Sequence, residues 1–473
     1  MSTPAAQPSR AAQQRLVDAI AQRRLPDAIA LSTELTQSHA EHAFGWHCLA
    51  VALELSDRFE EALPPMLRAI ALNDQDGQAW SNLAKLYKDL ARFDDAIAAS
   101  HRAIALQPND LVSHERLLYL LNHIDGHPDP ALKHARAFGA LMHRLHPVAF
   151  THAQAHRHAR LRVGLVSADF RHHPVAYFLQ DLLSAWLRLE VDIVLVNLNT
   201  QTDDLSAKLR ACVQSGALGE AAWMDVARLP LAQAAQRVHD AEIDVLVDLA
   251  GLSGGHRLPL FALRPAPVQV NWLGYFGTTG LTEMDAVLVD PYCRPAELAP
   301  RFTERLVSLP HSRLCYGHDG LRDAPPVAPL PALERGHVTL ACFQNLSKVT
   351  PEVMHVWSRI LRARPQTHLR LQGRQLGNAP GQDAARQRLT AAGIPSDRLQ
   401  LHAKTDYLSY LHAHAEVDFM VDTFPFPGGT TTCDALFMGV PTLTLDKPSL
   451  IGRQGASMMH NVGLSDWICD NED

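Results

Sequence analysis

The sequence lacks the features of three protein classes. Its 473 residues contain only seven cysteines, scattered singly without a Cys-x-x-Cys pair, so we expect neither a disulfide framework nor a structural zinc site. No apolar run reaches the roughly 18–20 residues of a membrane helix, and Met1 to Arg10 has no apolar stretch typical of a signal peptide. The net charge of −7 argues against a globally basic nucleic-acid-binding protein. We therefore expect a cytoplasmic protein with no membrane span and no nucleic-acid partner.

A repeat of 34 residues occupies the N-terminal part of the chain. Shifting the sequence by 34 positions brings Trp46 onto Trp80 and Phe59 onto Phe93. The pattern Trp-x2-Leu, Phe-x2-Ala and a proline near the end is typical of tetratricopeptide repeats, whose helix pairs stack and bury their apolar stripes against each other. The sequence predicts such repeats over residues 11–110. Their groove suits a peptide, but the pattern is equally compatible with a packing module.

Residues 111–159 are predicted to form a helical connector in which five histidines cluster. The spacing of His152 and His156 would place two imidazoles on one helix face, as a metal site requires. However, no Cys, Asp or Glu lies among the five. The segment therefore favours a solvated, partly basic connecting helix, and no metal site is predicted. The five histidines are His143, His146, His152, His156 and His158.

Two α/β halves are predicted to follow. Short apolar runs alternate with helical stretches, which predicts parallel sheets with helices on both faces. A Pro-rich linker at 324–335 divides a half at 160–323 from a half at 336–473. Ligands of such sheets bind beyond the carboxyl ends of the strands. The expected strands are 161–166, 191–197, 245–250, 268–272 and 286–289 in the first half, and 338–343, 368–371, 399–402, 419–422 and 442–445 in the second.

The segment DTFPFPGGTTTCD follows the predicted strand 419–422 and opens a helix. A diphosphate needs backbone amides that it can approach closely, as at Gly428 and Gly429, and hydroxyl donors such as Thr430 and Thr431. The helix N-terminus adds positive potential. Asp434, about one turn into the helix, suits hydrogen bonds from a sugar or ribose. The alternative is a glycine loop with threonine caps and no ligand, and the absence of a lysine after the glycines excludes a Walker A loop.

The segment FQNLSK follows the first strand of the second half and contains Phe343, Asn345 and Lys348. A lysine in this position would place a cation beside the diphosphate and neutralise charge on a departing nucleotide. An isolated lysine is more often a surface residue. Its place at the carboxyl end of a strand favours the functional interpretation.

The first half offers two further segments. SADFRHHP follows the first strand and contains His173, which is held by the next proline and is a candidate acid/base or orienting residue. NWLGYFGTTG, which contains Gly277, is a second glycine-rich loop at a strand end and would meet the acceptor or the donor from the opposite side. His239 precedes the strand 245–250 on the helix side, so the pattern alone favours a structural role for it.

These segments together resemble the bacterial members of one family, the O-linked N-acetylglucosamine (O-GlcNAc) transferases, a family that also includes the plant SPINDLY proteins. Members carry tetratricopeptide repeats before a GT-B glycosyltransferase module. The resemblance covers most of the chain from about residue 40 and implies further helices beyond Asp473. The motifs that carry it are LRVGLVSADFRHHPVAYFL, LFALRPAPVQVNWLGYFGTTG, FQNLSK and VDTFPFPGGTTTCDALFMGVPTLTL.

The resemblance implies roles for individual residues. His173 and His239 match histidines on the acceptor side of the family's site, and Lys348 matches the lysine on the donor diphosphate. Asn345 stands where the animal enzymes have a glutamine. The remaining matches form the diphosphate-binding helix start and the aspartate on the donor, namely Gly428, Gly429, Thr430, Thr431 and Asp434.

The chain also departs from the family pattern. Gly429 replaces a histidine of the animal members, and Tyr407 stands in place of the lysine that contacts the base, with Lys404 three residues away. Arg453 matches a family arginine to which we assign no role. The nucleobase is therefore less certain to be shared than the diphosphate.

The resemblance implies inverting transfer of a sugar from a nucleotide donor to a protein Ser or Thr hydroxyl, without a metal or another cofactor. UDP-GlcNAc is the first expectation for the donor. GDP-fucose, used by the SPINDLY branch, and a hexose donor of a related bacterial branch are alternatives. No Asp-x-Asp motif lies near the predicted cleft. The group that accepts the hydroxyl proton is left open, and a scaffold with a degenerate transferase module is the alternative of a different class.

Overall fold

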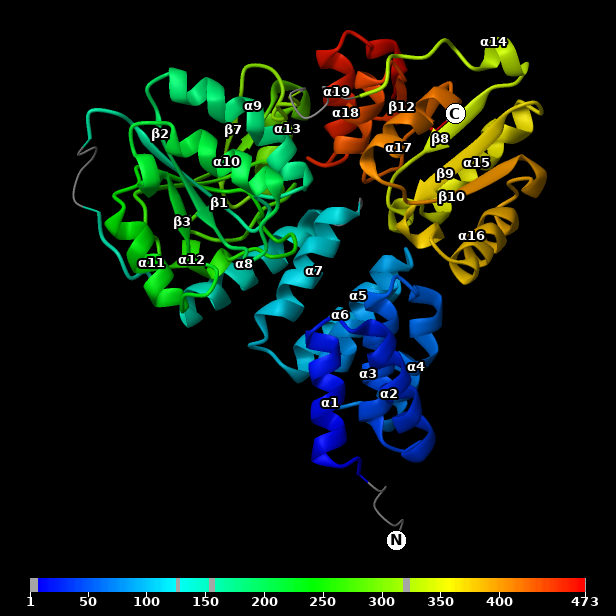
Figure 1. The fold of residues 1–473 in the computed structure, drawn as a ribbon, viewed down its shortest axis with the longest axis horizontal. Coiled ribbons are helices and arrows are strands. Elements are labelled where there is room, and N and C mark those ends of the chain that lie inside the picture. Colours follow the sequence, from blue (N-terminus) through cyan, green and yellow to red (C-terminus); the bar gives the residue numbers. More distant parts are fainter. Residues whose placement is uncertain (1–6, 125–127, 153–157, 318–323, 473) are drawn as a thin grey trace.

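The computed structural model describes residues 7–124, 128–152, 158–317 and 324–472, and it has three parts (Figure 1). A helical repeat domain forms a stem, and two α/β halves lie beyond it, one coloured green and the other yellow to red. The predicted fold class, a tetratricopeptide solenoid followed by two Rossmann-like halves, is confirmed. None of the helices in the described ranges is long and apolar enough to cross a membrane.

The repeat seen in the sequence is also a repeat of local structure. Arg23, Asp57 and Ala91, spaced by 34 residues, all adopt the left-handed conformation, with φ of 54°, 59° and 57°. The indole Nε1 atoms of Trp46 and Trp80 each donate a hydrogen bond to the carbonyl oxygen six residues earlier, at 2.8 and 2.9 Å. The helices are α1 (Arg10–Ala21), α2 (Leu25–Ser38), α3 (Ala43–Leu55), α4 (Phe59–Leu72), α5 (Gly77–Asp89) and α6 (Phe93–Leu106).

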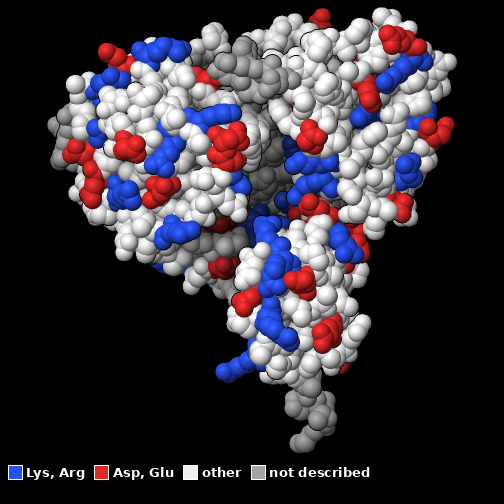
Figure 2. Space-filling view, viewed as in Figure 1, with Lys and Arg blue, Asp and Glu red and all other residues white. Residues whose placement is uncertain are grey.

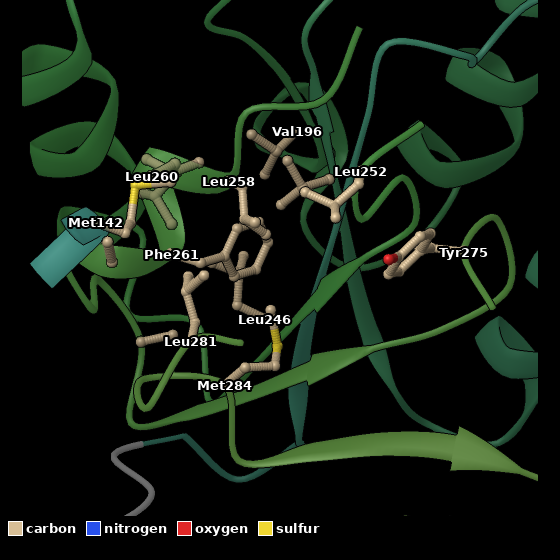
Figure 3. Close-up of a cluster of buried hydrophobic side chains, with 14 of the residues drawn as sticks. Met142, Val196, Leu246, Leu252, Leu258, Leu260, Phe261, Tyr275, Leu281 and Met284 are labelled. Carbon is tan, nitrogen blue, oxygen red and sulfur yellow. The ribbon is translucent and has the colours of Figure 1, made fainter. Parts of the chain in front are cut away.

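Two further helices join the repeats to the first α/β half. Helix α7 (Leu111–His123) stacks on α6, and α8 (Pro128–Leu145) packs against the sheet core. Met142 of α8 lies in the same buried cluster as Leu260 and Phe261 (Figure 3). The predicted connector is therefore helical as far as Leu145, and its second helix is part of the core of the N-terminal half.

The histidine cluster differs from the prediction. Because α8 ends before them, the later histidines do not lie on a connecting helix, and His152 Nε2 lies 2.9 Å from the carbonyl oxygen of Arg264. His143 and His158 face two different glutamates. His156 lies outside the described residues. The described members pack separately on the N-terminal half, so the cluster carries no shared site.

Close packing of Gly139 fixes α8 on the N-terminal half. A Cβ atom at Gly139 would lie 1.9 Å from the carbonyl oxygen of Gly280, which is backbone and cannot turn away. We expect Gly139→Ala to lower the free energy of unfolding by about 1–3 kcal/mol, because α8 must move off the core. Urea unfolding measures this change. Gly254→Ala is the matched control, since no atom lies within 4 Å of its Cβ position; equal stabilities of the two variants would contradict the prediction.

The N-terminal half contains one sheet of seven parallel strands in the order β3-β2-β1-β4-β5-β6-β7. The five predicted strands are present, whereas the edge strands β3 and β7 were not predicted. The strands are β1 (Arg162–Ser167), β2 (Asp192–Asn197), β3 (Trp223–Asp225), β4 (Val245–Asp248), β5 (Val268–Asn271), β6 (Ala286–Val289) and β7 (Arg305–Ser308). The helices are α9 (Pro174–Arg188), α10 (Asp204–Gln214), α11 (Leu231–Asp240), α12 (Leu258–Ala262) and α13 (Pro295–Leu298).

The C-terminal half contains six parallel strands in the order β10-β9-β8-β11-β12-β13. Residues 324–331 reach it without regular structure, and the predicted linker ends in the short helix α14 (Ala332–Arg335). The strands are β8 (Thr339–Cys342), β9 (His368–Gly373), β10 (Leu399–Ala403), β11 (Phe419–Val421), β12 (Thr442–Leu445) and β13 (Ile468–Cys469). The helices are α15 (Pro351–Ala363), α16 (Ala379–Ala391), α17 (Tyr407–His412), α18 (Thr430–Phe437) and α19 (Gln454–Asn461).

Both sheets reverse their strand order at one point, between β1 and β4 in the first and between β8 and β11 in the second. Chain connections leave in opposite directions at such a point, which opens a crevice at the carboxyl ends of the two strands. The segments singled out in the sequence, SADFRHHP, FQNLSK and the glycine-threonine loop, follow β1, β8 and β11. The fold thus brings them to the two crevices.

Candidate active site

A cavity of about 690 Å³ lies where the two halves and the repeat domain meet. Its walls come from the loops after β1 and β4, from the loops after β8 and β11, and from helix α7. Figure 2 shows a hollow at this junction, with Lys and Arg side chains gathered along the repeat domain toward it. The candidate site is therefore a cleft between both sheets that the repeat domain helps to close.

Lys348 supplies a cation to the wall formed by the C-terminal half. Its Nζ atom donates a hydrogen bond to the carbonyl oxygen of Pro427 at 3.0 Å and lies 4.0 Å from the ring centroid of Phe426. Burial lowers the pKa of Lys348 to about 8, although the buried carboxylate of Asp422 acts to raise it. The ammonium group is thus held at the cavity wall without a carboxylate in salt-bridge distance among the described residues, so an anion in the cavity would satisfy it.

Asp422 holds the glycine-threonine loop in place. This buried carboxylate accepts hydrogen bonds from the backbone N–H of Gly428 at 2.8 Å and from Thr444 Oγ1 at 2.8 Å. Gln344 Nε2 donates a third, at 2.5 Å. Burial raises the pKa of Asp422, and these donors oppose the rise. The sequence placed Asp422 at the start of the motif, but it did not reveal that this side chain anchors the loop.

The loop after β11 matches the anion site that the sequence predicts in part. A Cβ atom at Gly428 would lie 2.3 Å from Thr432 Oγ1 and 3.0 Å from Gln344 Nε2, so only glycine fits there. Gly429, Thr430 and Thr431 line the cavity at the N-terminus of α18. The backbone N–H of Gly428, in contrast, is bonded to Asp422, and Gly428 does not belong to the cavity lining. A helix N-terminus attracts an anion, so the diphosphate position stays a prediction that Gly429, Thr430 and Thr431 support.

Asp434 lies behind the loop rather than in the cavity wall. It is 2% exposed, and it accepts hydrogen bonds from the hydroxyl groups of Tyr316 and, at 2.9 Å, Tyr407. Tyr316 belongs to the N-terminal half, so this carboxylate joins the two halves. Burial raises the pKa of Asp434, and the tyrosine hydroxyls counteract the increase. Its predicted contact with the donor stays a prediction, and in this structure both tyrosine hydroxyls donate to the same oxygen, Oδ1.

His173 lines the cavity from the N-terminal half. It caps α9, and its Nδ1 accepts a hydrogen bond from the backbone N–H of Val175 at 3.3 Å while lying 3.6 Å from Asp169 Oδ2. Burial lowers the pKa of His173, so the ring is neutral near pH 7. In a neutral ring, an accepting Nδ1 leaves the proton on Nε2, which makes Nε2 a donor.

His239 does not reach this cavity. It lies near the end of α11, where its ring stacks on Phe150 with centroids 4.5 Å apart. Its Nδ1 lies 3.3 Å from the carbonyl oxygen of Pro265. The resemblance assigned it to the acceptor side, but α11 covers the sheet away from the carboxyl ends of the strands. The structure therefore corrects this assignment and supports the structural role that the pattern alone favoured.

The other predicted site residues differ in their distance from the cavity. Asn345 lines the cavity next to Lys348. Phe343 is buried under Tyr410, with centroids 5.9 Å apart. Gly277 packs against Asn122 of α7, where a Cβ atom would lie 2.5 Å from the amide carbon. Phe343 and Gly277 thus support the wall from behind instead of forming it.

Three side chains of the wall come from segments that the sequence analysis did not select. Tyr119 lies on α7, Arg313 follows β7 and Gln454 begins α19. None belongs to a glycine-rich loop or a strand-end motif, so local pattern gives no reason to choose them. They reach the cavity only because the repeat domain and the two halves pack together.

Comparisons with known proteins agree with this architecture. The family model described as Glycosyl transferase family 41 matches residues 102–321 and 332–473. A probable UDP-N-acetylglucosamine–peptide N-acetylglucosaminyltransferase SPINDLY of Arabidopsis thaliana is 33% identical over 374 residues, which are 77% of this chain and 40% of that protein. A protein of the same description from Petunia hybrida is 34% identical over 66% of this chain and 33% of its own length. The chain thus spans less than half the length of these plant relatives.

A solved structure is similar over nearly the whole chain. The structure of a lysine-to-methionine mutant of the Thermobaculum terrenum O-GlcNAc transferase superposes with a TM-score of 0.86 at 28% sequence identity. The match covers 98% of this chain and 89% of the other. With the family model covering the connector and both α/β halves, the chain belongs to Glycosyl transferase family 41.

Proposed function

We propose that the chain is a protein O-GlcNAc transferase that moves N-acetylglucosamine from UDP-GlcNAc to Ser or Thr hydroxyls with inversion. The observation that carries the proposal is the cavity in which Lys348, Thr430 and Thr431 face His173 across the two halves. A cation and a helix N-terminus are the groups that stabilise a leaving diphosphate as it develops charge, which supports the proposal. The names of the plant relatives support UDP-N-acetylglucosamine as the donor and a peptide as the acceptor. The name of the bacterial structure supports transfer of O-GlcNAc.

The transfer is proposed to need no metal or other cofactor. Lys348, the threonine hydroxyls and the amides at the start of α18 supply the positive potential that a metal would otherwise provide. His172, Asp203 and Asp204 bring three possible ligand atoms within 4.8 Å of one another. However, the His172 ring is already hydrogen-bonded to Asp204, and the Asp203 carboxylate accepts from the backbone N–H of His172. They carry no step of the proposed reaction.

His173 is proposed to orient the reactants. A neutral ring with its proton on Nε2 donates a hydrogen bond to a phosphate or sugar oxygen more readily than it removes a proton from a hydroxyl. Acceptor peptides are proposed to approach along the repeat groove, because α7 continues the solenoid into the cavity wall at Tyr119.

The second candidate is a protein O-fucosyltransferase that uses GDP-fucose. The observation in its favour is Tyr407, which occupies the place of the family's base-contacting lysine and is committed to Asp434. The wall of the diphosphate site is the same for both donors, so it does not distinguish between them. A repeat scaffold with a degenerate transferase module is the third candidate. The presence of Lys348 and of the glycine-threonine loop in the cavity wall argues against it.

Calorimetry with UDP, GDP, UDP-GlcNAc and GDP-fucose tests the proposal. We expect UDP to bind at least about tenfold more tightly than GDP, a difference of about 1.4 kcal/mol. Incubation with UDP-GlcNAc and a Ser/Thr peptide should then release UDP. Preference for GDP would transfer the assignment to the fucosyl donor, and absence of binding by all four would remove the enzyme proposal.

A further inference from the structure

Arg313 is a buried cation in the cavity wall. Arg313 is 3% exposed, and it lines the cavity from the N-terminal half. Both backbone polar groups of Arg313 are hydrogen-bonded: its N–H donates to Asp290 Oδ2 at 3.1 Å, and its carbonyl oxygen accepts from Trp272 Nε1 at 2.9 Å. The backbone position of Arg313 is therefore set by the fold of the N-terminal half.

This guanidinium group differs from the other buried ones in the described ranges. Arg370 and Arg453 are 5% and 3% exposed, and each pairs with a carboxylate, Glu416 and Glu297 respectively. For Arg313, the recorded side-chain partner among the described residues is Oε1 of Gln454, which is neutral. A guanidinium group carries five N–H donors, and burying its charge without a counter-ion is costly.

Gln454 connects Arg313 to the glycine-threonine loop. Its Nε2 donates to the carbonyl oxygen of Gly428 at 2.9 Å, next to the Pro427 carbonyl that accepts from Lys348 at 3.0 Å. A Cβ atom at Gly429 would lie 3.1 Å from the same Nε2, so the second glycine leaves room for this contact. The loop is thus contacted by Lys348 and by Gln454 of its own half, and Gln454 links it to Arg313 on the other side of the cleft.

We propose that Arg313, positioned by Gln454, binds the donor diphosphate as a second cation, together with Lys348. A guanidinium group matches two oxygens of a phosphate with parallel hydrogen bonds, and the bound diphosphate supplies a counter-charge that Arg313 does not find among the described residues. The inference rests on the proposed function, because it names a further residue for the same donor. It also makes the N-terminal half a direct participant in donor binding.

The test compares Arg313→Met with wild type by calorimetry, using UDP, uridine and inorganic diphosphate as ligands. We expect the affinity for UDP and for diphosphate to fall about 10- to 100-fold, and the affinity for uridine to stay unchanged. Without ligand, the variant should melt at the same temperature as wild type or higher, since a buried charge without a counter-ion has been removed. Arg313→Lys, which keeps the charge, should retain part of the affinity.

The control is Arg294→Met, which removes an exposed arginine paired with Asp446 and should leave all three affinities unchanged. Wild-type UDP affinity in Arg313→Met would overturn the inference and leave the proposed function intact. An equal loss for uridine, or a lower melting temperature with unchanged affinities, would assign Arg313 to the fold and overturn it as well. If wild type binds diphosphate but neither UDP nor GDP, and the variant loses diphosphate, the inference stands and the proposed function fails.

Discussion

Replacement of Lys348 by methionine is expected to lower kcat about 100- to 1,000-fold, the range measured when one preorganised electrostatic contact to a developing charge is removed. Methionine keeps the length and apolar character of the side chain, so the contact with the Phe426 ring at 4.0 Å is largely preserved and the charge alone is lost. The leaving diphosphate then develops negative charge against the Pro427 carbonyl without a cation. Initial rates at saturating UDP-GlcNAc measure the effect.

Lys404→Met is the control for this experiment. Lys404 is exposed just after β10 and lies outside the cavity wall, so its loss should leave kcat unchanged. A larger effect of Lys348→Met on kcat than on UDP affinity would show that the ammonium group acts mainly on the transition state. Wild-type turnover in Lys348→Met would show that the departing group lies elsewhere.

The affinity for UDP is expected to fall as the pH rises above about 8, by about tenfold for each pH unit. Burial lowers the pKa of Lys348 to about 8, so the free protein holds the protonated ammonium below this value and the neutral amine above it. A diphosphate binds the protonated form, which raises the pKa of Lys348 in the complex. Binding at pH 8–9 therefore takes up a proton, and the decline ends at the pKa of the complex.

Calorimetry between pH 7.5 and 9.5, in buffers of different ionisation enthalpy, measures both the affinity and the proton uptake. The terminal phosphate of UDP is already ionised in this range, and His173, whose pKa is lowered by burial, is already neutral. Lys348→Met should show a flat profile without proton uptake. A flat profile in wild type would mean that the lysine keeps its proton throughout and that burial does not govern its charge.

The sequence predicted most of the fold because the repeat and the strands are recorded locally. The 34-residue period returned as three left-handed turns at Arg23, Asp57 and Ala91, and the long buried strands stood out as apolar runs. The strands that it missed are short and lie at sheet edges, such as Trp223–Asp225 and Ile468–Cys469. Such short segments become strands because they pair with a neighbouring strand. Their own residues do not show an apolar run or an alternation from which this pairing could be predicted.

The site could be predicted from the sequence only for residues that lie on a loop directly after a strand. Lys348, Thr430 and Thr431 reached the cavity because they follow strands whose carboxyl ends meet there. Arg313 could not be found in this way, since its place depends on contacts between distant segments. His239 shows the opposite error: a residue type was carried over from the family without a motif around it, and the fold places it on α11, stacked on Phe150.

The stacking of α7 against the cavity defines where this protein can be divided. Tyr119 lines the cavity, and His123 on the same helix lies 4.3 Å from the ring of Phe426, which covers Lys348. A recombinant exchange of repeats would therefore have to join the new solenoid before α7, close to residue 102 where the family model begins. A junction after α8 would remove Tyr119 and with it one wall of the cavity. The part of the chain that has to stay together therefore consists of α7, α8 and the two α/β halves.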